Sequence, residues 1–338
     1  MENFDFEEIK PDDEVGKIIE EGMISAFCTK YIMVGQDRTV FASYYLQYAE
    51  KLKKFEVYDD DVWVASFPKA GTTWTQEMVW MIANNLDFQG AKQSLRERFP
   101  FLEISTILKR ESVLHEASNL PIPQYHTNSV EYTKNLQRPR FIKSHLPFSL
   151  LPEQLQSGTR SPKMIYVVRN PKDTCISYYH HGTLLMGWTI SLENFVKVFM
   201  ADKSTYGSYW KHVLGYWNKR HLPNLLIIKY EDMKSNLPSV IKTVAQFLNK
   251  EITEEQIQLL CKHLSFESMK SNPAVNFEEL AKKLRKSNMV AKDGTFIRTG
   301  IVGKYKEELS PETINKFNEW IKANIRETEL ENEYIFQI

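Results

Sequence analysis

Apolar residues in this chain form short runs of strand length, separated by longer segments in which they recur at helical spacing. The strand-like runs begin at Val62 and recur at 140–143, 163–168 and 225–230. The segments with helical spacing are 72–84, 172–181, 206–220, 240–248 and 254–261. Strands that alternate with helices favour an α/β fold, in which helices cover both faces of a central, mainly parallel sheet.

The parts of the chain outside this alternation carry weaker patterns. Residues 1–40 begin with an acidic stretch and have no regular spacing, so we expect a mobile or peripheral arm there. Residues 40–55 have apolar positions near helical spacing, which predicts a helix before the first strand. Residues 85–137 show aromatic and proline clusters but few strand or helix signals. We therefore expect an acidic arm over 1–40 and one domain over 41–330.

The loop after the first predicted strand has the composition of an anion-binding site. It holds Lys69, Gly71, Thr72 and Thr73 within the sequence FPKAGTTW. The helix N-terminus supplies positive potential, Lys69 adds a charge, and Gly71 lets the backbone come close to a ligand. The order differs from Gly-Lys-Ser/Thr, the phosphate loop that works with magnesium. We expect this loop to hold a phosphate or phosphosulfate without a metal, and an ordinary strand–turn–helix is the alternative.

Polar segments follow the predicted strands and should meet in one crevice, because ligands of such folds bind beyond the carboxyl ends of the strands. The segments are 67–73, 144–145, 169–170 and 230–231. His145 is suited to act as a general base near neutral pH, and Lys143 could neutralise charge on a leaving group. Arg169 and the downstream Ser177 can clamp a phosphate through charge-assisted hydrogen bonds.

Three further residues could complete a nucleotide site. Arg298 lies in FIRTGIVG (296–303), whose two glycines suggest a loop that folds over a ligand. Trp74 and Phe266 offer aromatic faces on which a purine ring can stack. Taken singly, each of these aromatic residues is more often simply part of the core.

Charge and cysteine content narrow the function classes. The chain has 338 residues, and 43 Lys plus Arg balance 43 Asp plus Glu, so the formal net charge is zero. This balance argues against a general nucleic-acid-binding protein, although 282–306 is locally basic. Three widely spaced cysteines fit neither a disulfide framework nor a zinc site. With no leader-like or membrane-length apolar run, we expect a reduced, cytoplasmic protein without a membrane or nucleic-acid partner.

Taken together, these segments resemble the cytosolic sulfotransferases. Four motifs carry the resemblance: FPKAGTTW (67–74), IKSHLP (142–147), VVRNPKDTCISYY (167–179) and FIRTGIVG (296–303). KYEDMK and SFESMKSNP also fit, and ERFPFLE at 97–103 is similar to insect members of the family. The resemblance implies a single α/β domain that transfers the sulfuryl group of 3'-phosphoadenosine-5'-phosphosulfate (PAPS) to a hydroxyl of a small hydrophobic acceptor, such as a phenol or steroid. It implies no metal.

The resemblance also implies roles for individual residues. His145 would be the catalytic base, assisted by Lys143 and Lys69. PAPS, or its product adenosine 3',5'-bisphosphate (PAP), would be held by Lys69, Ala70, Gly71, Thr72, Thr73, Trp74, Arg169, Ser177, Tyr230, Ser265, Phe266, Arg298, Thr299 and Gly300. The acceptor would contact Phe27, Phe99, Phe101, Lys143, His145, Phe148, His181 and Leu184.

Two departures from the family pattern affect these implications. The family's Arg-Lys-Gly is here Arg298-Thr299-Gly300, so one basic side chain at the 3'-phosphate is missing, and Lys304 is a candidate to compensate. The short dimerisation segment that many members carry keeps only Lys306, which leaves the oligomeric state open.

Three alternative functions remain at this stage. One is dehydration of an allylic alcohol through a transient sulfate, as in a retinol dehydratase of the insect branch. A second is a nucleotide kinase, which the missing Gly-Lys-Ser/Thr and the lack of an evident magnesium-binding carboxylate oppose. The third is a non-catalytic protein that binds a lipophilic ligand, which the pair Lys143 and His145 opposes.

Overall fold

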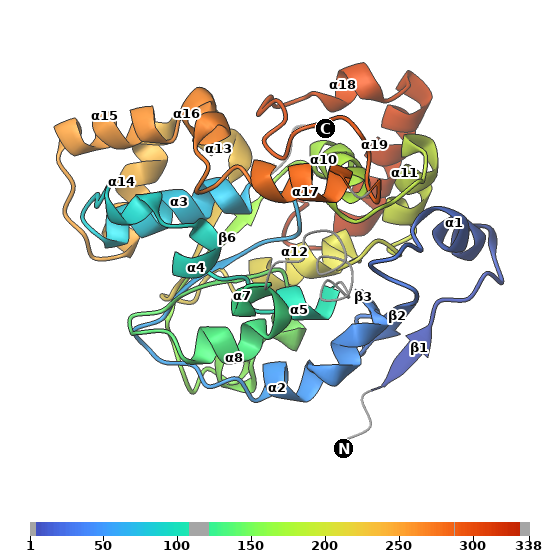
Figure 1. The fold of residues 1–338 in the computed structure, drawn as a ribbon, viewed down its shortest axis with the longest axis horizontal. Helices are drawn as coiled ribbons and strands as arrows, with labels where there is room; N and C mark the ends of the chain where they lie inside the picture. Colours follow the sequence, from blue (N-terminus) through green and yellow to red (C-terminus); the bar gives the residue numbers. More distant parts are fainter. Residues whose placement is uncertain (1–4, 108–121, 287, 332–338) are drawn as a thin grey trace.

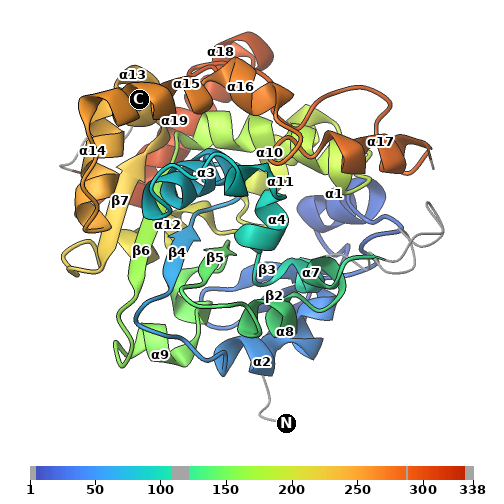
Figure 2. The ribbon, with the colours of Figure 1, turned by 60° about the vertical axis from the view of Figure 1, so that its left-hand side comes forward.

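The structure, a computed structural model, describes residues 5–107, 122–286 and 288–331 (Figure 1). A four-stranded parallel sheet lies at its centre (Figure 2). Its strand order is β5-β4-β6-β7. The strands are β4 (Val62–Ala65), β5 (Phe141–Ser144), β6 (Lys163–Val168) and β7 (Leu225–Lys229). Val62 pairs with Phe141 on one side and with Lys163 on the other. The predicted α/β fold with a central parallel sheet is confirmed.

Helices cover both faces of this sheet (Figure 2), and alternate residues of each strand enter two separate apolar clusters. Val64 belongs to the cluster that contains side chains of α3 (Thr72–Ala83), α14 (Leu237–Phe247), α15 (Glu254–His263) and α16 (Phe266–Ser271). Trp63 and Ala65 belong to the cluster formed with α10 (Pro171–Leu185), α11 (Leu192–Met200), α12 (Tyr209–Trp217) and α19 (Pro311–Ile325). The sheet is therefore buried on both sides, as its apolar strands predict.

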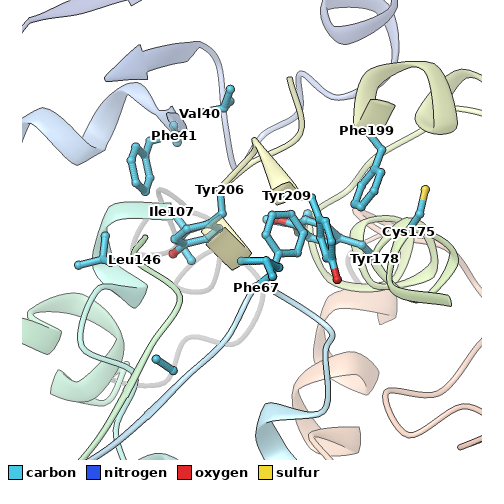
Figure 3. Close-up of a cluster of buried hydrophobic side chains, with 14 of the residues drawn as sticks. Val40, Phe41, Phe67, Ile107, Leu146, Cys175, Tyr178, Phe199, Tyr206 and Tyr209 are labelled. Carbon is cyan, nitrogen blue, oxygen red and sulfur yellow. The ribbon is translucent and has the colours of Figure 1, made fainter. Parts of the chain in front are cut away.

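The larger cluster fixes the start of the loop that follows β4. Phe67 lies edge-on to the rings of Tyr178, Phe199 and Tyr209, which come from α10, α11 and α12 (Figure 3). Tyr209 also donates a hydrogen bond of 2.6 Å from its hydroxyl to the backbone carbonyl of Arg169. One packed region thus positions the chain after both β4 and β6.

Local capping explains where α10 begins. Asn170 accepts a hydrogen bond of 2.9 Å from the backbone N–H of Lys172, and Pro171 occupies the first helical position. The helix therefore starts directly after Arg169, which leaves that side chain at the carboxyl end of β6.

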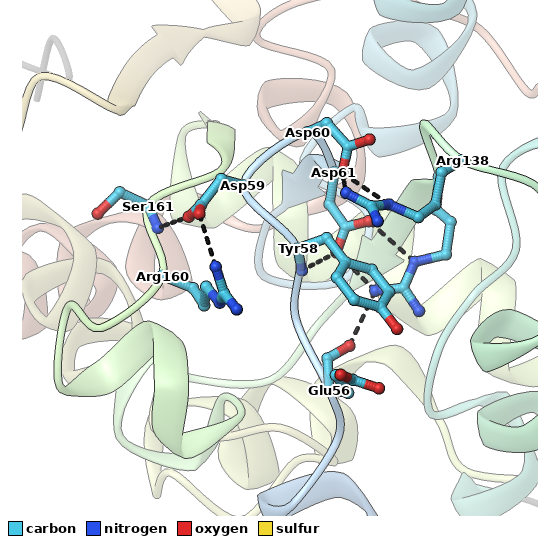
Figure 4. Close-up of polar contacts among 9 residues, drawn as sticks. Glu56, Tyr58, Asp59, Asp60, Asp61, Arg138, Arg160 and Ser161 are labelled. Carbon is cyan, nitrogen blue, oxygen red and sulfur yellow. Dashed lines mark hydrogen bonds and ion pairs between the residues drawn. The ribbon is translucent and has the colours of Figure 1, made fainter.

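Ion pairs join the segments that precede β4 and β5, at the edge of the sheet opposite to the carboxyl ends of its strands (Figure 4). The fully buried guanidinium of Arg140 donates to both carboxylate oxygens of Asp61, at 2.8 and 2.6 Å. Arg138–Asp60 and Arg160–Asp59 are neighbouring pairs at the surface. Surface pairs of this kind contribute little, whereas breaking the buried pair would leave an uncompensated charge.

Residues 1–40, where we expected a mobile or peripheral arm, contain regular elements in their described part. This segment contains β1 (Phe6–Glu8), α1 (Glu14–Gly22), β2 (Tyr31–Val34) and part of β3 (Thr39–Ala42), and the strands form an antiparallel sheet. The apolar residues Met23, Phe27 and Tyr31 are buried in the main core, while the acidic residues lie on the exposed side. The acidic composition therefore describes only the outer surface of a packed element.

Two other predictions need correction in detail. Residues 40–55 form the end of β3, a 3-10 helix η1 (Ser43–Gln47) and α2 (Ala49–Lys53), not one helix. The weak-signal region 85–137 contains several one-turn or two-turn helices. These are η2 (Gly90–Lys92), α4 (Leu95–Arg98), α5 (Ile104–Ile107), α7 (Gln124–Thr127) and α8 (Ser129–Lys134), with 108–121 outside the described residues.

The remaining described elements are short connectors and the C-terminal helices. They are η3 (Phe148–Leu150), α9 (Glu153–Gln156), α13 (Tyr230–Ser235), α17 (Glu278–Lys286) and α18 (Tyr305–Glu308). Within the described ranges, no helix has both the length and the apolarity needed to cross a membrane.

Candidate active site

A cavity of about 250 Å³ lies beyond the carboxyl ends of the four parallel strands. Each strand contributes to it: Lys69 follows β4, His145 follows β5, Arg169 follows β6 and Tyr230 follows β7. The cationic side chains in its wall are Lys69, Arg96, Lys143, Arg169, Lys234 and Arg298. None of the described residues in the wall is Asp or Glu. The cavity is thus built to receive a ligand that carries several negative charges.

The loop between β4 and α3 brings its backbone to the edge of this cavity. Gly71 has a φ of +111°, and a Cβ atom there would lie 2.6 Å from Cδ2 of Tyr230. Both the positive φ and the close contact require glycine. Helix α3 begins at Thr72, so its N-terminal N–H groups and the residues Thr72 and Thr73 face the cavity. This is the arrangement by which helix N-termini bind phosphate groups.

Lys69 is held in surroundings that disfavour its positive charge. Its Nζ lies 4.0 Å from the centre of the Phe296 ring. Burial, followed by the charges of Lys143, Arg169 and Arg298, lowers the pKa of Lys69 from 10.5 to about 7. An anion bound beside it would reverse this effect.

Arg169 has an incomplete set of hydrogen-bond partners. Its guanidinium lies 4.3 Å from the centre of the Tyr230 ring and donates to the backbone carbonyls of Lys69 and Ile301, at 3.3 and 3.4 Å. Its buried Nε has no hydrogen-bond partner in the described structure. A buried donor without an acceptor is costly, so this nitrogen is suited to an anionic ligand.

Aromatic side chains flank the cationic part of the cavity. The rings of Trp74 and Tyr230 meet edge to face, with 5.6 Å between their centres, and the indole N–H of Trp74 donates to the carbonyl of Leu264 at 2.9 Å. Gly300 has a φ of +61°, and a Cβ atom there would lie 2.7 Å from Phe266. Phe266 and the loop at Gly300 therefore pack closely, and Phe266 lines the cavity together with Trp74 and Tyr230.

His145 is oriented by its backbone-facing nitrogen. Its Nδ1 lies 2.7 Å from the carbonyl oxygen of Ser66, and since a carbonyl can only accept, Nδ1 carries the proton. Nε2 is then the basic nitrogen. Burial, followed by the charge of Lys143, lowers the pKa of His145 well below 6.5, so the ring is neutral at neutral pH. Phe101 lies edge-on to the ring at 4.9 Å, and His212 donates to the His145 carbonyl at 3.0 Å.

Glu103 lies directly behind His145 and is completely buried. One carboxylate oxygen accepts from the backbone N–H of His145 at 2.5 Å, and the other accepts from the hydroxyl of Ser144 at 3.1 Å. The hydroxyl of Tyr206 donates at 3.4 Å. Burial raises the pKa of Glu103 from 4.5 to about 7. Glu103 was not among the predicted site residues. In the sequence it is the last residue of ERFPFLE, and an acidic residue at the end of an apolar run was the one sign of its role.

The comparisons with known proteins identify the family. The sulfotransferase domain model matches residues 59–329, which is most of the chain. The protein belongs to the sulfotransferase family. Luciferin sulfotransferase of Photinus pyralis is 49% identical over 317 residues, covering 94% of this chain and 85% of that protein. Two solved structures of retinol dehydratase also match.

The structural match extends over nearly the whole chain. Retinol dehydratase in complex with androsterone and inactive cofactor PAP gives a TM-score of 0.84 at 33% identity, covering 98% of both chains. Its complex with retinol and PAP gives 0.83 at 34% identity, covering 96% of this chain and 98% of that chain. The predictions of an insect-type sulfotransferase and of PAPS as its sulfuryl donor are confirmed.

Most residues predicted for the active site of this sulfotransferase line its cavity. Those that do are Lys69, Gly71, Thr72, Thr73, Trp74, Phe99, Phe101, Lys143, His145, Arg169, Ser177, His181, Tyr230, Phe266, Arg298, Thr299 and Gly300. The unpartnered Nε of Arg169 and the close packing at Gly71 and Gly300 fit a nucleotide that carries phosphate groups.

Five predicted site residues lie outside the cavity wall. Ala70 is buried beneath the loop, and Ser265 uses its hydroxyl to cap α16 by accepting from Ser268 N–H. Phe27 is buried in the core at the N-terminal sheet, Phe148 packs against Tyr216 at 5.6 Å, and Leu184 faces the core from α10. The structure thus places these three residues in side-chain packing outside the cavity wall, and their contact with an acceptor stays a prediction.

Other wall residues of the sulfotransferase were not predicted. They are Gln76, Leu95, Arg96, Ile104, Ile107, Tyr125, His126, Tyr178, Leu185, Met186, Tyr206, Lys234, Leu264, Met269, Phe277, Leu280, Phe296 and Ile297, together with Pro68. Lys304, the candidate to replace the missing basic residue, forms an ion pair with Glu307 and is absent from the wall. Arg298 pairs with Glu308 at 2.5 Å.

Proposed function

We propose that this sulfotransferase transfers the sulfuryl group of PAPS to a hydroxyl of a small hydrophobic acceptor, with His145 as the general base. The observation that carries the proposal is the orientation of the His145 ring. The hydrogen bond from Nδ1 to the Ser66 carbonyl fixes the tautomer in which Nε2 has the free lone pair. The lowered pKa keeps that lone pair available at neutral pH.

The cationic part of the cavity would hold the nucleotide. Lys69 and the N-terminus of α3 are suited to the 5'-phosphosulfate, and Arg169 with Ser177 and Arg298 to the 3'-phosphate. Trp74, Tyr230 and Phe266 would surround the adenine. Thr299 stands where the family usually has a lysine, and Lys304 is engaged by Glu307. Arg298 is likewise paired with Glu308, whereas Arg169 keeps a buried Nε without a partner, so the 3'-phosphate would depend mainly on Arg169.

The transfer step follows from these positions. The acceptor hydroxyl loses its proton to Nε2 of His145 while its oxygen forms a bond to sulfur. At the same time the bond between sulfur and the bridging oxygen of the nucleotide breaks, and PAP leaves. Lys69 and Lys143, together with the N–H groups of the loop, would stabilise the charge that develops on that bridging oxygen. In-line positioning supplies the rest of the acceleration, as in phosphoryl transfer.

The acceptor would lie against the aromatic wall near His145. Phe99, Phe101, Ile104 and Tyr206 line this part of the cavity, which suits a flat, largely apolar molecule. The relatives named for luciferin and for retinol support an acceptor of this class. The whole-chain match to retinol dehydratase also favours dehydration of an allylic alcohol as a second candidate outcome.

Product analysis separates these outcomes. The enzyme would be incubated with radiolabelled PAPS and with luciferin, a phenol, androsterone or retinol, and the products identified by mass spectrometry. We expect label in a stable sulfate ester for at least one phenol. Unlabelled alkene from retinol alone would support dehydration instead. Consumption of none of these acceptors, with PAP bound normally, would contradict the proposal and return the binding-protein alternative.

We also propose that the enzyme acts in the cytosol. Its three cysteines are free, and Cys28 and Cys175 are buried among apolar side chains, which suits a reducing compartment. The nucleotide kinase is not supported, since the family assignment accounts for the phosphate-binding loop. The absence of a nucleic-acid partner remains a prediction.

A further inference from the structure

Arg96 is a cation of the cavity wall that the nucleotide does not explain. It lies on the short helix α4 and lines the cavity, with its guanidinium 4.0 Å from the centre of the Phe277 ring. Its side chain also makes a hydrogen bond with Tyr125. Burial lowers the pKa of Arg96, so the guanidinium occupies a partly desolvated position.

The neighbouring arginines are neutralised, whereas Arg96 is not. Arg98, two residues along the same helix, forms a buried ion pair with Glu77. Arg298, in the opposite wall, pairs with Glu308. Among the residues that the structure describes, no carboxylate forms an ion pair with Arg96, and none contributes to the cavity wall. The Arg96 side chain is partly exposed within the cavity, and a cation partly withdrawn from water with no anion beside it is suited to an anionic ligand.

Arg96 is separated from the nucleotide-binding cations by two aromatic rings. The ring centres of Phe277 and Phe296 are 4.4 Å apart. Nζ of Lys69 lies 4.0 Å from the centre of the Phe296 ring. Arg96 contacts this pair through Phe277. We therefore expect phosphates held by Lys69 and Arg169 to lie across these two rings from Arg96.

The contacts of Arg96 lead instead to the acceptor side. Tyr125 belongs to α7, which is joined to α5 by a hydrogen bond of 2.9 Å from the Ser105 hydroxyl to the His126 carbonyl. Helix α5 directly follows the segment that holds Phe101, whose ring contacts His145. Arg96 and the catalytic base thus face one continuous cavity from different elements.

We propose that Arg96 binds a carboxylate on the acceptor, so that the preferred acceptors are hydroxylated aromatic acids. This inference rests on the proposed function, because it assigns the chemical class of the molecule that His145 deprotonates. The guanidinium would hold the carboxylate while Phe277 and Tyr125 keep its planar face fixed. A hydrogen bond between two charged groups in such a site should raise kcat/KM for the acid by about tenfold to a hundredfold over a neutral analogue.

Matched acceptors test this directly. Radiolabelled PAPS would be used with para-hydroxybenzoate, para-hydroxyphenylpropanoate and 6-hydroxy-2-naphthoate, each beside its methyl ester, and with naphthol as a neutral reference. These acids place the carboxylate at different distances from the reacting hydroxyl. We expect at least one acid to exceed its ester by about tenfold in kcat/KM. Equal values for every acid–ester pair would overturn the inference.

Variants assign any preference to Arg96. Arg96→Met should bring the ratio of kcat/KM for the acid to kcat/KM for its ester near one. Arg96→Lys keeps the positive charge and should therefore keep part of the preference for the acid. Lys92→Met, an exposed cation in η2, is the matched control and should keep the wild-type ratio. A ratio unchanged in Arg96→Met would overturn the assignment. Sulfation of naphthol without any acid preference refutes this inference alone, whereas no transfer to naphthol or to any acid refutes the proposed function as well.

Discussion

Replacement of Glu103 by glutamine tests the electrostatics beneath His145, the proposed catalytic base. Glu103→Gln keeps the shape of the side chain and resembles its protonated form. The amide oxygen can accept from the N–H of His145, and the amide NH₂ can donate to the hydroxyl of Ser144. We therefore expect the variant to fold and to keep His145 in place.

The magnitude follows from the pKa of Glu103, which burial raises from 4.5 to about 7. Because the folded-state pKa is the higher one, the folded protein binds more protons than the unfolded chain between these values. The free energy of unfolding therefore falls as the pH rises through this window. The shift corresponds to a loss of about 3 kcal/mol, most of it complete near pH 7 and level above about pH 8. Glutamine removes this loss.

The assay is denaturant unfolding of both proteins over a series of pH values from about pH 5 to about pH 8. Other titrating groups, including His145, contribute to both proteins, so they cancel in the difference. We expect Glu103→Gln to gain stability relative to the wild type by roughly 2 to 3 kcal/mol across this range. Parallel curves would refute the reasoning, since they would mean that Glu103 titrates in the folded protein as it does in the unfolded chain.

Three further predictions concern the cavity and the core. Gly71→Ala should weaken PAP binding by about tenfold, because the new Cβ would meet Tyr230 and the positive φ would be strained by about 1–3 kcal/mol. Calorimetry of both proteins measures the affinity for PAP, and equal affinities would contradict this prediction. PAP binding should take up nearly one proton per site at about pH 8, because a bound anion raises the pKa of Lys69 above its value of about 7 in the free protein. The affinity for PAP should therefore fall as the pH rises above about 7. Calorimetric titrations in buffers of different ionisation enthalpy should show the proton uptake, and Lys69→Met should lack it. Arg140→Met should lower the free energy of unfolding by about 3–5 kcal/mol, because Asp61 would remain buried without its partner. Denaturant unfolding measures this loss, and a loss below about 1 kcal/mol would show that the pair is not stabilising.

The sequence predicts the sheet correctly, and most residues that it predicts for the nucleotide line one cavity, for a physical reason. A phosphate-binding loop depends on local geometry: Gly71 must follow a strand and precede a helix, and Lys69 must lie within the same turn. Parallel strands then bring their carboxyl ends together, so Lys143 and Arg169 join the loop without any further signal.

The parts that the sequence predicts poorly depend on contacts between distant segments. Phe27 is an apolar residue in an acidic region, and only the tertiary fold shows that it packs in the core, outside the cavity wall. Glu103 and Arg96 lie in a region of one-turn helices with weak periodicity. Their significance depends on which side chains face them, namely the His145 backbone for one and Phe277 with Tyr125 for the other.

The most direct test of the central claim is a single-turnover measurement with His145→Gln and the wild type. Enzyme saturated with radiolabelled PAPS would be mixed with excess naphthol, and the label transferred in the first turnover would be followed by rapid quench. The rate then reports the chemical step rather than product release. We predict a fall of about a hundredfold or more in the variant, typical of losing a general base, with PAP affinity unchanged. A variant that transfers sulfate within a few fold of the wild-type rate would show that His145 is not the base.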